Sequence, residues 1–288
     1  MSDTCLSVII PTYNRPDRLR NCLKSLTMQQ SVLAAWEVVV VNDGGVDVTK
    51  IVNEFSSILN VVYVNQENAG PAKARNHGAE NAQSDYLAFL DDDCEPTPDW
   101  ISNIVSVIKP GILIGGKVVN ILKDNVYSES CQSLIDYLYT RLDDTTDMFF
   151  TSNNMCISRA DFIKTGGFDP SFHTSAGEDR EYCVRAAQAG IRLIHVPEIS
   201  IGHAHHLNIT SFIRLHFKYG RAADTYRKSV HKMEIKNRTN GGSGFYLGLL
   251  LYPFRERLHD PFKQSVLLAI SQACTISGYL YQHLTGRN

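Results

Sequence analysis

The feature that most constrains this chain is a short apolar run that ends in three consecutive carboxylates. Residues Tyr86 to Leu90 have the pattern of a buried strand, and Asp91, Asp92 and Asp93 follow at its carboxyl end. Three adjacent anions repel one another, and burying them is costly unless water or a cation compensates them. Ligands of open α/β sheets bind outside the carboxyl ends of the strands, so the location suits a site. Oxygen-only ligands favour Mg²⁺ or Mn²⁺ over zinc. The plainer alternative is a solvated acidic turn before the next helix.

Composition and cysteine usage indicate a globular intracellular protein. A chain of 288 residues with 43% hydrophobic and 20% charged residues can bury a substantial core. The first residues contain neither a basic region nor a long apolar region, so we expect no secretory signal. The seven cysteines are scattered and form no Cys-x-x-Cys pair. This argues against disulfides or a zinc site, and for a reducing cytosol.

Strands and helices alternate in the first part of the chain. Strands are expected at residues 6–10, 37–41, 61–64 and 86–90, with a further one at 192–196, and helices at residues 15–28, 48–55 and 72–81. This alternation predicts an α/β fold with a mostly parallel sheet and helices on both faces. The loops after the first, second and fourth strands should then converge on one edge, where they bring together Pro11–Arg15, Asp43 and Asp91–Asp93.

Motifs in a fixed order carry a family resemblance. They are Ser-Val-Ile-Ile-Pro-Thr-Tyr-Asn-Arg at 7–15, Val-Val-Val-Val-Asn-Asp-Gly at 38–44, Asn-Ala-Gly-Pro-Ala-Lys-Ala-Arg-Asn-His-Gly at 68–78, and the aspartate run. Together they resemble the nucleotide-sugar half of glycosyltransferase family 2, which has the GT-A fold. The resemblance continues with Thr-Ser-Asn-Asn-Met-Cys-Ile-Ser-Arg at 151–159, Gly-Gly-Phe-Asp at 166–169 and Gly-Glu-Asp-Arg-Glu at 177–181, and it covers about residues 5–225. The family has Glu-Asp-x-Asp at the last motif, so Glu181 is a small departure.

The resemblance implies an inverting transferase that moves a sugar from a nucleotide diphosphate to an acceptor hydroxyl. A divalent cation, Mn²⁺ or Mg²⁺, would stand against the leaving diphosphate. Asp93 is the first expected ligand and His203 the second, and histidine suits Mn²⁺ better. Asp91 would lie nearer the ribose or share the metal. The alternative for His203 is a hydrogen-bonded loop histidine.

The resemblance also assigns the nucleotide and the base. Asp43 would accept a hydrogen bond from a base N–H, although Asn-Asp-Gly-Gly at 42–45 also suits a tight turn. Arg75 would reach a phosphate or the ribose, or else pair with a surface acid. The remaining residues of the predicted donor site are Pro11, Thr12, Tyr13, Arg15, Gly70 and Asp92.

Asp179 would be the general base, kept ionised by its place in the first turn of a helix. Next to it, Glu178 fits a capping box with Ser175 and could serve only as a cap. Glu181 could pair with Arg185 on the helix surface.

The C-terminal part has its own pattern. Residues 206–288 carry 12 Lys/Arg and 4 Asp/Glu, a balance of +8, which leaves −10 for residues 1–205. An apolar seam and a basic stripe predict an amphipathic helix; the seam contains Phe212, Leu215, Tyr219, Ala222, Tyr226, Val230 and Met233, and the stripe Arg214, Lys218, Arg221, Lys228 and Lys232. We expect the seam either to touch an anionic membrane peripherally at its inner face or to pack on the catalytic domain or a second subunit. The later apolar runs, 245–254 and 266–281, are too short or too interrupted to span a bilayer.

These inferences predict a catalytic domain at 1–210, with a nucleotide-sugar half at about 1–110 and an acceptor half at about 111–210, and a helical extension at 211–288. UDP-sugars are the commonest donors of the resembled family, with GDP- and dTDP-sugars as alternatives. The acceptor could be a glycan, a lipid-linked saccharide or a small metabolite, and we expect no nucleic-acid partner.

Two rival functions stay open: a non-catalytic nucleotide- or carbohydrate-binding module, and a metal-dependent nucleotide-sugar hydrolase. A haloacid-dehalogenase phosphatase is excluded, because its Asp-x-Asp follows the first strand.

Overall fold

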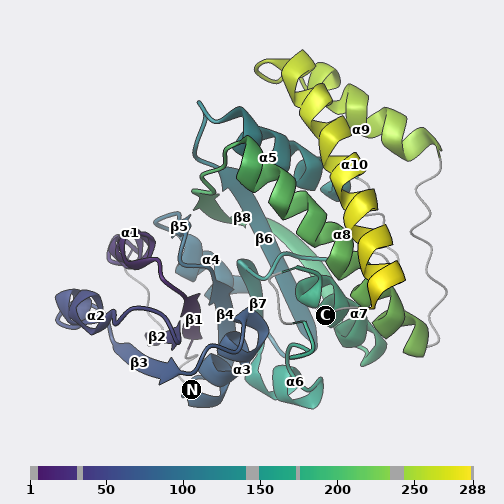
Figure 1. The fold of residues 1–288 in the computed structure, drawn as a ribbon. Coiled ribbons are helices and arrows are strands. Elements are labelled where there is room, and N and C mark those ends of the chain that lie inside the picture. The colour runs from purple at the N-terminus through teal and green to yellow at the C-terminus, as the bar shows by residue number, and fades with distance from the viewer. Residues whose placement is uncertain (1–5, 31–34, 141–148, 173–175, 234–242, 287–288) are drawn as a thin grey trace. The chain divides into compact units, whose positions relative to one another are not determined.

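The computed structural model describes residues 6–30, 35–140, 149–172, 176–233 and 243–286 (Figure 1). The chain divides into two compact units. The sheet unit is Met1–Val119 with Phe149–His203, and the helical unit is Asn120–Met148 with Ala204–Asn288. This division differs from the predicted boundary after residue 210. The reason is that one helix from the middle of the chain packs with the C-terminal helices.

An eight-stranded sheet has the order β3-β2-β1-β4-β7-β6-β8-β5. Its strands are β1 (Leu6–Thr12), β2 (Trp36–Asp43), β3 (Val61–Gln66), β4 (Tyr86–Leu90), β5 (Cys94–Pro96), β6 (Ile112–Asn120), β7 (Asn154–Ser158) and β8 (Arg192–His203). The first four strands pair in parallel, as predicted. However, β7 is antiparallel to both β4 and β6, and β5 is antiparallel to β8, so the whole sheet is mixed.

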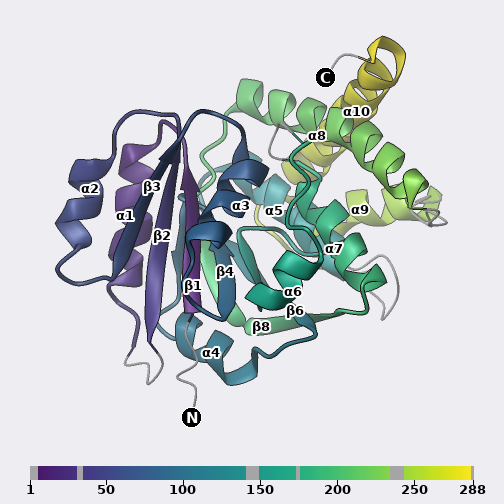
Figure 2. The ribbon, with the colours of Figure 1, turned by 90° about the horizontal axis from the view of Figure 1, so that it is seen from below.

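Helices cover both faces of this sheet, which confirms the predicted α/β class (Figure 2). They are α1 (Pro16–Leu26), α2 (Thr49–Phe55), α3 (Pro71–Asn81), α4 (Trp100–Val107), α6 (Arg159–Lys164) and α7 (Glu178–Gln188). Side chains alternate between the faces with the period of a strand. Val8 and Ile10 pack with α1, α2 and α4. The intervening Ile9 faces α3, where a Cβ on Gly78 would collide with it.

Strand β8 is longer than predicted. The expected strand ended at residue 196, because Pro197 interrupts the apolar run, but β8 continues through Pro197 to His203. The second half of β8 pairs with β5, and this pairing sets Cys94 opposite His203. A strand of three residues thus fixes where that histidine lies.

The helical unit contains α5 (Val126–Tyr139), α8 (Ile209–Lys232), α9 (Ser243–Arg255) and α10 (Pro261–Thr285). The predicted amphipathic helix is α8, and Phe212, Ala222, Tyr226 and Val230 of its seam are buried. Helices α8 and α10 approach closely at two glycines: a Cβ on Gly220 would collide with the Thr275 carbonyl, and one on Gly278 with the Phe217 carbonyl. The seam therefore packs within its own unit, in part against α5, which the sequence had assigned to the catalytic domain. Among the described residues, no helix is long and apolar enough to cross a membrane.

Candidate functional site

The loops after β1, β2 and β4 meet at the carboxyl edge of the sheet, as the sequence predicted. Register explains why: Ile9 pairs with Val39 on one side and with Phe89 on the other, so the three strands end close together. Across the loops, the Thr12 hydroxyl donates to Asp92 Oδ2 at 2.7 Å. The Val46 backbone N–H donates to Asn14 Oδ1 at 2.9 Å.

The acidic run is held by arginines. Asp92 lies 3.2 Å from Arg15, and Asp93 lies 2.7 Å from Arg18 and 3.5 Å from Arg15. The Asp92 and Asp93 side chains are only 3% and 5% exposed, so a solvated acidic turn does not describe them. Burial, with the charge of Asp93 added, raises the pKa of Asp92 to about 6. Burial also opposes the charge of Asp93, but His203 and the two arginines outweigh it and hold the pKa of Asp93 well below its usual range.

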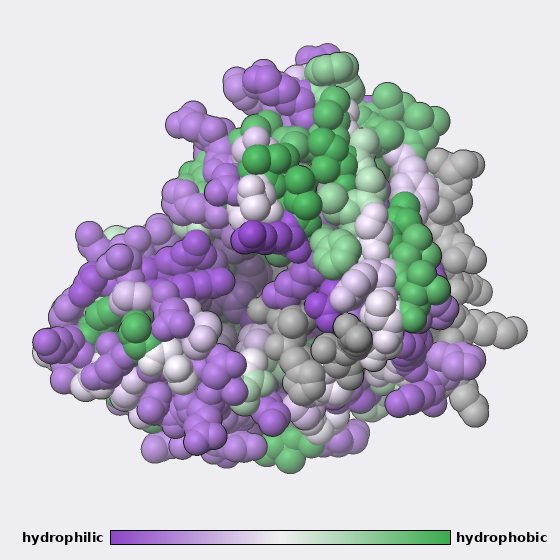
Figure 3. All heavy atoms as spheres, in the orientation of Figure 1, coloured by the Kyte–Doolittle hydropathy of each residue, from purple (hydrophilic) through white to green (hydrophobic). Residues whose placement is uncertain are grey.

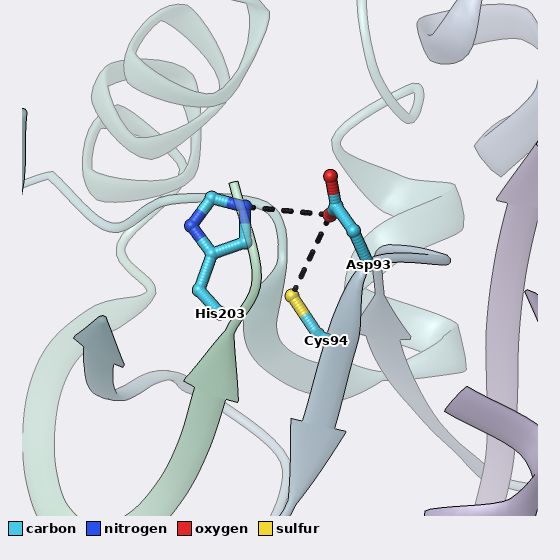
Figure 4. A group of neighbouring side chains, drawn as sticks. All are labelled: Asp93, Cys94 and His203. Atoms are coloured by element: carbon cyan, nitrogen blue, oxygen red, sulfur yellow. Dashed lines mark hydrogen bonds and ion pairs between the residues drawn. The ribbon is translucent and has the colours of Figure 1, made fainter. Parts of the chain in front are cut away.

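Asp93, Cys94 and His203 form a candidate metal centre (Figure 4). His203 Nε2 lies 3.3 Å from Asp93 Oδ1, and Cys94 Sγ lies 4.0 Å from the same oxygen. One ligand atom from each residue lies within 4.8 Å of the others. A carboxylate, an imidazole and a sulfur so close together fit a divalent first-row ion, so the two predicted ligands are suitably placed. Cys94 was not among the predicted ligands. Its position directly after the three aspartates was the one feature of the sequence that could have indicated it.

Arg75 connects the acidic run to α7. Its guanidinium lies 2.6 Å from Asp91 and 3.1 Å from Glu178, and it stands over the Phe168 ring at 5.7 Å. One alternative for Arg75 was a pair with a surface acid. Glu178 does not fit it, because this acid is only 2% exposed. Within the described part of the chain, Arg75 Nε and Glu178 Oε2 are buried without a hydrogen-bond partner. Both atoms are thus available for a further polar group.

Helix α7 begins differently from the prediction. Its N-cap residue is Gly177 at φ 86°, which makes no side-chain cap, and Ser175 lies outside the described residues. Glu178 pairs with Arg75 rather than capping the helix. Glu181 pairs with Arg185 at 2.7 Å, as predicted, but its side chain is 1% exposed, so the pair does not lie on the helix surface.

Burial raises the pKa of both acids at the start of α7. Burial, together with the neighbouring Asp179, raises the pKa of Glu178 to about 7. Burial also raises the pKa of Asp179, even though its carboxylate accepts the Arg180 N–H at 2.8 Å. Desolvation thus opposes the charge that the helix start was expected to favour at Asp179.

The Asp43 carboxylate is held by hydrogen bonds from neighbouring amide groups. Its carboxylate accepts from Gln66 Nε2 at 2.7 Å and from the backbone N–H groups of Ala69 and Gly70 at 2.8 and 2.9 Å. Gly70, at φ 88°, is the N-cap residue of α3. Asn42 Oδ1 also accepts from the Gly45 N–H at 3.1 Å, so the tight turn is present.

The other predicted donor-site residues lie around these two groups. Tyr13 is 48% exposed, Pro11 is partly buried, and the Arg15 side chain is half-exposed beside the acidic pair. The contacts thus bring Thr12, Arg15, Asp92, Asp93 and His203 into one network and join Arg75 to Asp91 and Glu178 in a second, while Asp43 and Gly70 form a third.

The Gly-Gly-Phe-Asp motif fastens the second half of the sheet unit to α3. Asn76 donates to the Phe168 carbonyl at 2.8 Å and accepts the Phe168 N–H at 2.9 Å. Gly167 is required at φ 68°, because a Cβ there would lie 2.7 Å from Asn76 Oδ1. Phe168 packs on Phe89 at 5.1 Å between ring centroids. Asn76 and Arg18 were both missed as functional candidates, since nothing local distinguishes them from other polar helix residues.

Comparisons with known proteins agree with this geometry. The sequence profile described as "Glycosyl transferase family 2" matches residues 7–166, and one described as "N-terminal domain of galactosyltransferase" matches residues 139–209. Glycosyltransferase AglE of Haloferax volcanii is 39% identical over 118 residues, which cover 39% of each chain. Validoxylamine A glucosyltransferase of Streptomyces hygroscopicus is 31% identical over 220 residues, 65% of this chain and 52% of the relative. The chain spans between 32% and 52% of the length of these and a third curated relative.

A solved structure shares the fold. The mannosyltransferase PcManGT from Pyrobaculum calidifontis, in complex with GDP-Man and Mn²⁺, superposes with a TM-score of 0.67 over 98% of this chain and 88% of that one, at 17% identity. The likeness confirms the predicted GT-A type of α/β fold with its helical C-terminal part.

Proposed function

Because the chain belongs to glycosyl transferase family 2, we propose that it transfers a sugar from a nucleotide-diphosphate sugar to an acceptor hydroxyl and inverts the anomeric centre. The observation that carries the proposal is the buried acidic network at the carboxyl edge of the sheet. Asp93 lies there in contact with His203, and Asp91 lies in contact with Arg75, which also reaches Glu178 next to the proposed base Asp179. Arg75 thus joins a donor-side acid to an acid beside the proposed base.

Asp93 and His203 would hold Mn²⁺ or Mg²⁺, with Cys94 beside them. When bound, the ion supplies a positive charge that stabilises the leaving diphosphate. The arginines that contact Asp93 are partly exposed, with side chains 50% exposed at Arg15 and 32% at Arg18. Their long side chains can turn from the carboxylate to the phosphates of the donor, and guanidinium groups bind phosphate well.

Asp179 is the proposed general base, which accepts the proton of the acceptor hydroxyl. A base works best when its pKa lies near the operating pH, and burial shifts that of Asp179 upward toward it. The positive charge of Arg75 opposes this shift. Glu178 would serve as a positioning residue through its contact with Arg75.

We propose a UDP-sugar as the donor, and the GDP-Man in the solved mannosyltransferase makes a GDP-sugar the main alternative. Asp43 would contribute by fixing the loop at Gly70 and by offering its carboxylate edge to a base N–H. The proposed acceptor is a carbohydrate or a lipid-linked saccharide. For residues 211–288, peripheral contact with a membrane and contact with a second copy are the two proposals.

A nucleotide panel tests the proposal. Thermal shift with UDP, GDP, dTDP and CMP should give the largest stabilisation with UDP and Mn²⁺, and EDTA should remove it. Incubation of the favoured sugar nucleotide with candidate acceptors should then yield a glycoside. Release of free sugar at the same rate with and without acceptors would instead indicate a hydrolase. Nucleotide binding without any turnover would indicate a binding module.

A further inference from the structure

Helix α10 buries several polar side chains and exposes large apolar ones. Its inward side includes Gln264, Ser271 and Gln282, each at most 3% exposed, together with the buried Leu267 and Leu268. Its outward side carries large apolar residues, among which Phe262 is 73% and Leu284 80% exposed. A helix at a protein surface normally shows the opposite distribution.

Polar contacts and close packing fix this orientation. Gln264 accepts from the Ser133 hydroxyl at 2.6 Å and donates to the His259 carbonyl at 2.7 Å, and Gln282 accepts from Arg221 at 2.9 Å. Gly278 leaves no room for a side chain against α8. Rotation of α10 to hide its apolar side would bury Phe262 in place of a satisfied glutamine, so the apolar side stays outward.

The apolar side is continuous along the helix. We define the outer stripe of α10 as Phe262, Val266, Ala269, Ala273, Ile276, Leu280 and Leu284, all exposed and spaced by three or four residues. It extends over some 33 Å, at 1.5 Å per residue. From Pro261 to Thr285 the sequence contains one Lys and one His and no other ionisable residue apart from tyrosine and cysteine. Hydrophobic side chains gather over α9 and α10 on the face shown in Figure 3.

Cations and tyrosines border the outer stripe. Arg227 of α8 stands over the Tyr279 ring at 5.0 Å and lies 3.3 Å from its hydroxyl, and Arg221 stands over Tyr281 at 5.9 Å. Tyrosine prefers the boundary between hydrocarbon and water, and arginine lays its stem on apolar surface while its charge stays at the polar level. An apolar stripe with such a border matches a helix that lies in a membrane interface.

We propose that the outer stripe of α10 lies flat on an anionic lipid surface and places the chain there peripherally. The charge of this part of the chain selects the occupant. Residues 206–288 carry a balance of +8 and residues 120–148 of the same unit a balance of −4, so the helical unit carries +4, which attracts anionic headgroups. A second copy seated on the same stripe would bring two surfaces of equal positive charge together. The inference moves the lipid contact from α8, whose seam is buried, to α10.

Vesicle flotation tests this surface at low salt. The probes are vesicles of equal parts phosphatidylcholine and phosphatidylglycerol, and vesicles of phosphatidylcholine alone. We expect the wild type to float with the anionic vesicles and far less with the neutral ones. The double variant Ile276→Gln/Leu280→Gln should bind the anionic vesicles at least tenfold more weakly. A matched control, Ile58→Gln/Ile163→Gln, replaces equally exposed isoleucines of the sheet unit and should bind like the wild type.

Wild-type protein that stays in the soluble fraction with anionic vesicles would overturn the proposal, as would an α10 variant that floats like the wild type. A dimer in analytical ultracentrifugation that the α10 variant dissociates would also overturn it and assign the stripe to a second copy. Thermal unfolding should be alike in all three proteins, because the substituted side chains are exposed. Nucleotide-induced thermal shifts should be alike too, so loss of lipid binding is separable from failure of the proposed transferase function.

Discussion

Two aspartates at the same edge of the sheet are neutralised in different ways. Asp43, the last residue of β2, accepts hydrogen bonds from the backbone N–H groups of Ala69 and Gly70 and from the Gln66 amide. Asp93, near the end of β4, is compensated by Arg18 and the other charged side chains that contact it. Backbone donors cannot leave without rearranging the loop, whereas a partly exposed arginine can rotate away.

The difference shows which carboxylate can exchange partners. A group held by fixed donors mainly shapes the site, and a group held by mobile cations can pass its charge to a metal or a ligand. Asp43 is therefore expected to affect mainly stability and Asp93 mainly activity. Residues of α7 extend the comparison, since Glu178 is neutralised by an arginine that is itself buried.

The largest effect is expected for Asp93→Asn. Loss of the ligand charge should lower transfer by about 10³-fold or more, since an ion at the leaving group contributes several kcal/mol. EDTA should abolish wild-type activity, and Mn²⁺ or Mg²⁺ should restore it; steady-state transfer rates measure both effects. Asp85→Asn, at an exposed acid before the same strand, is the control and should stay active. Full wild-type activity in EDTA would refute the metal assignment for both Asp93 and His203.

Asp179→Asn is expected to come next. It keeps the shape of the side chain and removes the proton acceptor, so kcat should fall by roughly 10² or more. Affinity for UDP or GDP should change only a few fold, because the donor-side loops are untouched. The pH profile of kcat/KM should lose its acidic limb. Near wild-type turnover would place the base elsewhere, with Glu178 and Glu181 to be examined next.

Asp43→Asn should affect stability more than chemistry. The new amide turns a donor toward the N–H groups of Ala69 or Gly70 and leaves one of them unsatisfied, at a cost of about 1–3 kcal/mol. Chemical denaturation should show this loss, while kcat at saturating donor should fall far less than in Asp93→Asn. Asp47→Asn, on an exposed acid of the same turn, is the control. A stable Asp43→Asn with abolished turnover would reverse the contrast.

The smallest effect concerns pH. A carboxyl pKa raised to about 7 means that folded Glu178 keeps a proton that the unfolded chain has released. Its contribution to stability is full below the unfolded pKa near 4.5 and declines as pH rises toward 7, by at most about 1.4 kcal/mol per pH unit. Glu178→Gln should remove this decline and still accept from Arg75. Its melting temperature relative to the wild type should therefore rise between about pH 5 and pH 8; a constant difference would contradict the raised pKa.

The sequence predicted the local elements of the sheet unit well, because strand runs, Pro and Gly alternate cleanly up to Leu90. It also placed the acidic run at the functional edge, since a parallel sheet fixes where strand ends meet. The sequence could not predict which distant strands pair. No local pattern shows that β7 lies antiparallel beside β4, or that β5 places Cys94 opposite His203. Burial was equally hidden, and it raises the pKa of Asp179 against the expected effect of the helix start. The partners of Glu178 and Asn76 lie far away in the chain, so spacing could not reveal them.

The helical unit is assembled from two stretches of chain that are separated by β7, α6, α7 and β8. Helix α5 is therefore synthesised well before its partners α9 and α10. Tyr137 of α5 can be buried only after Leu249 of α9 and Leu268 of α10 have been synthesised. The helical unit can therefore be completed only after the C-terminal helices have been synthesised. In biosynthesis the C-terminal helices are thus not a detachable appendage. A nascent chain released before α10 would expose an orphaned apolar surface in its middle and become a substrate for chaperones.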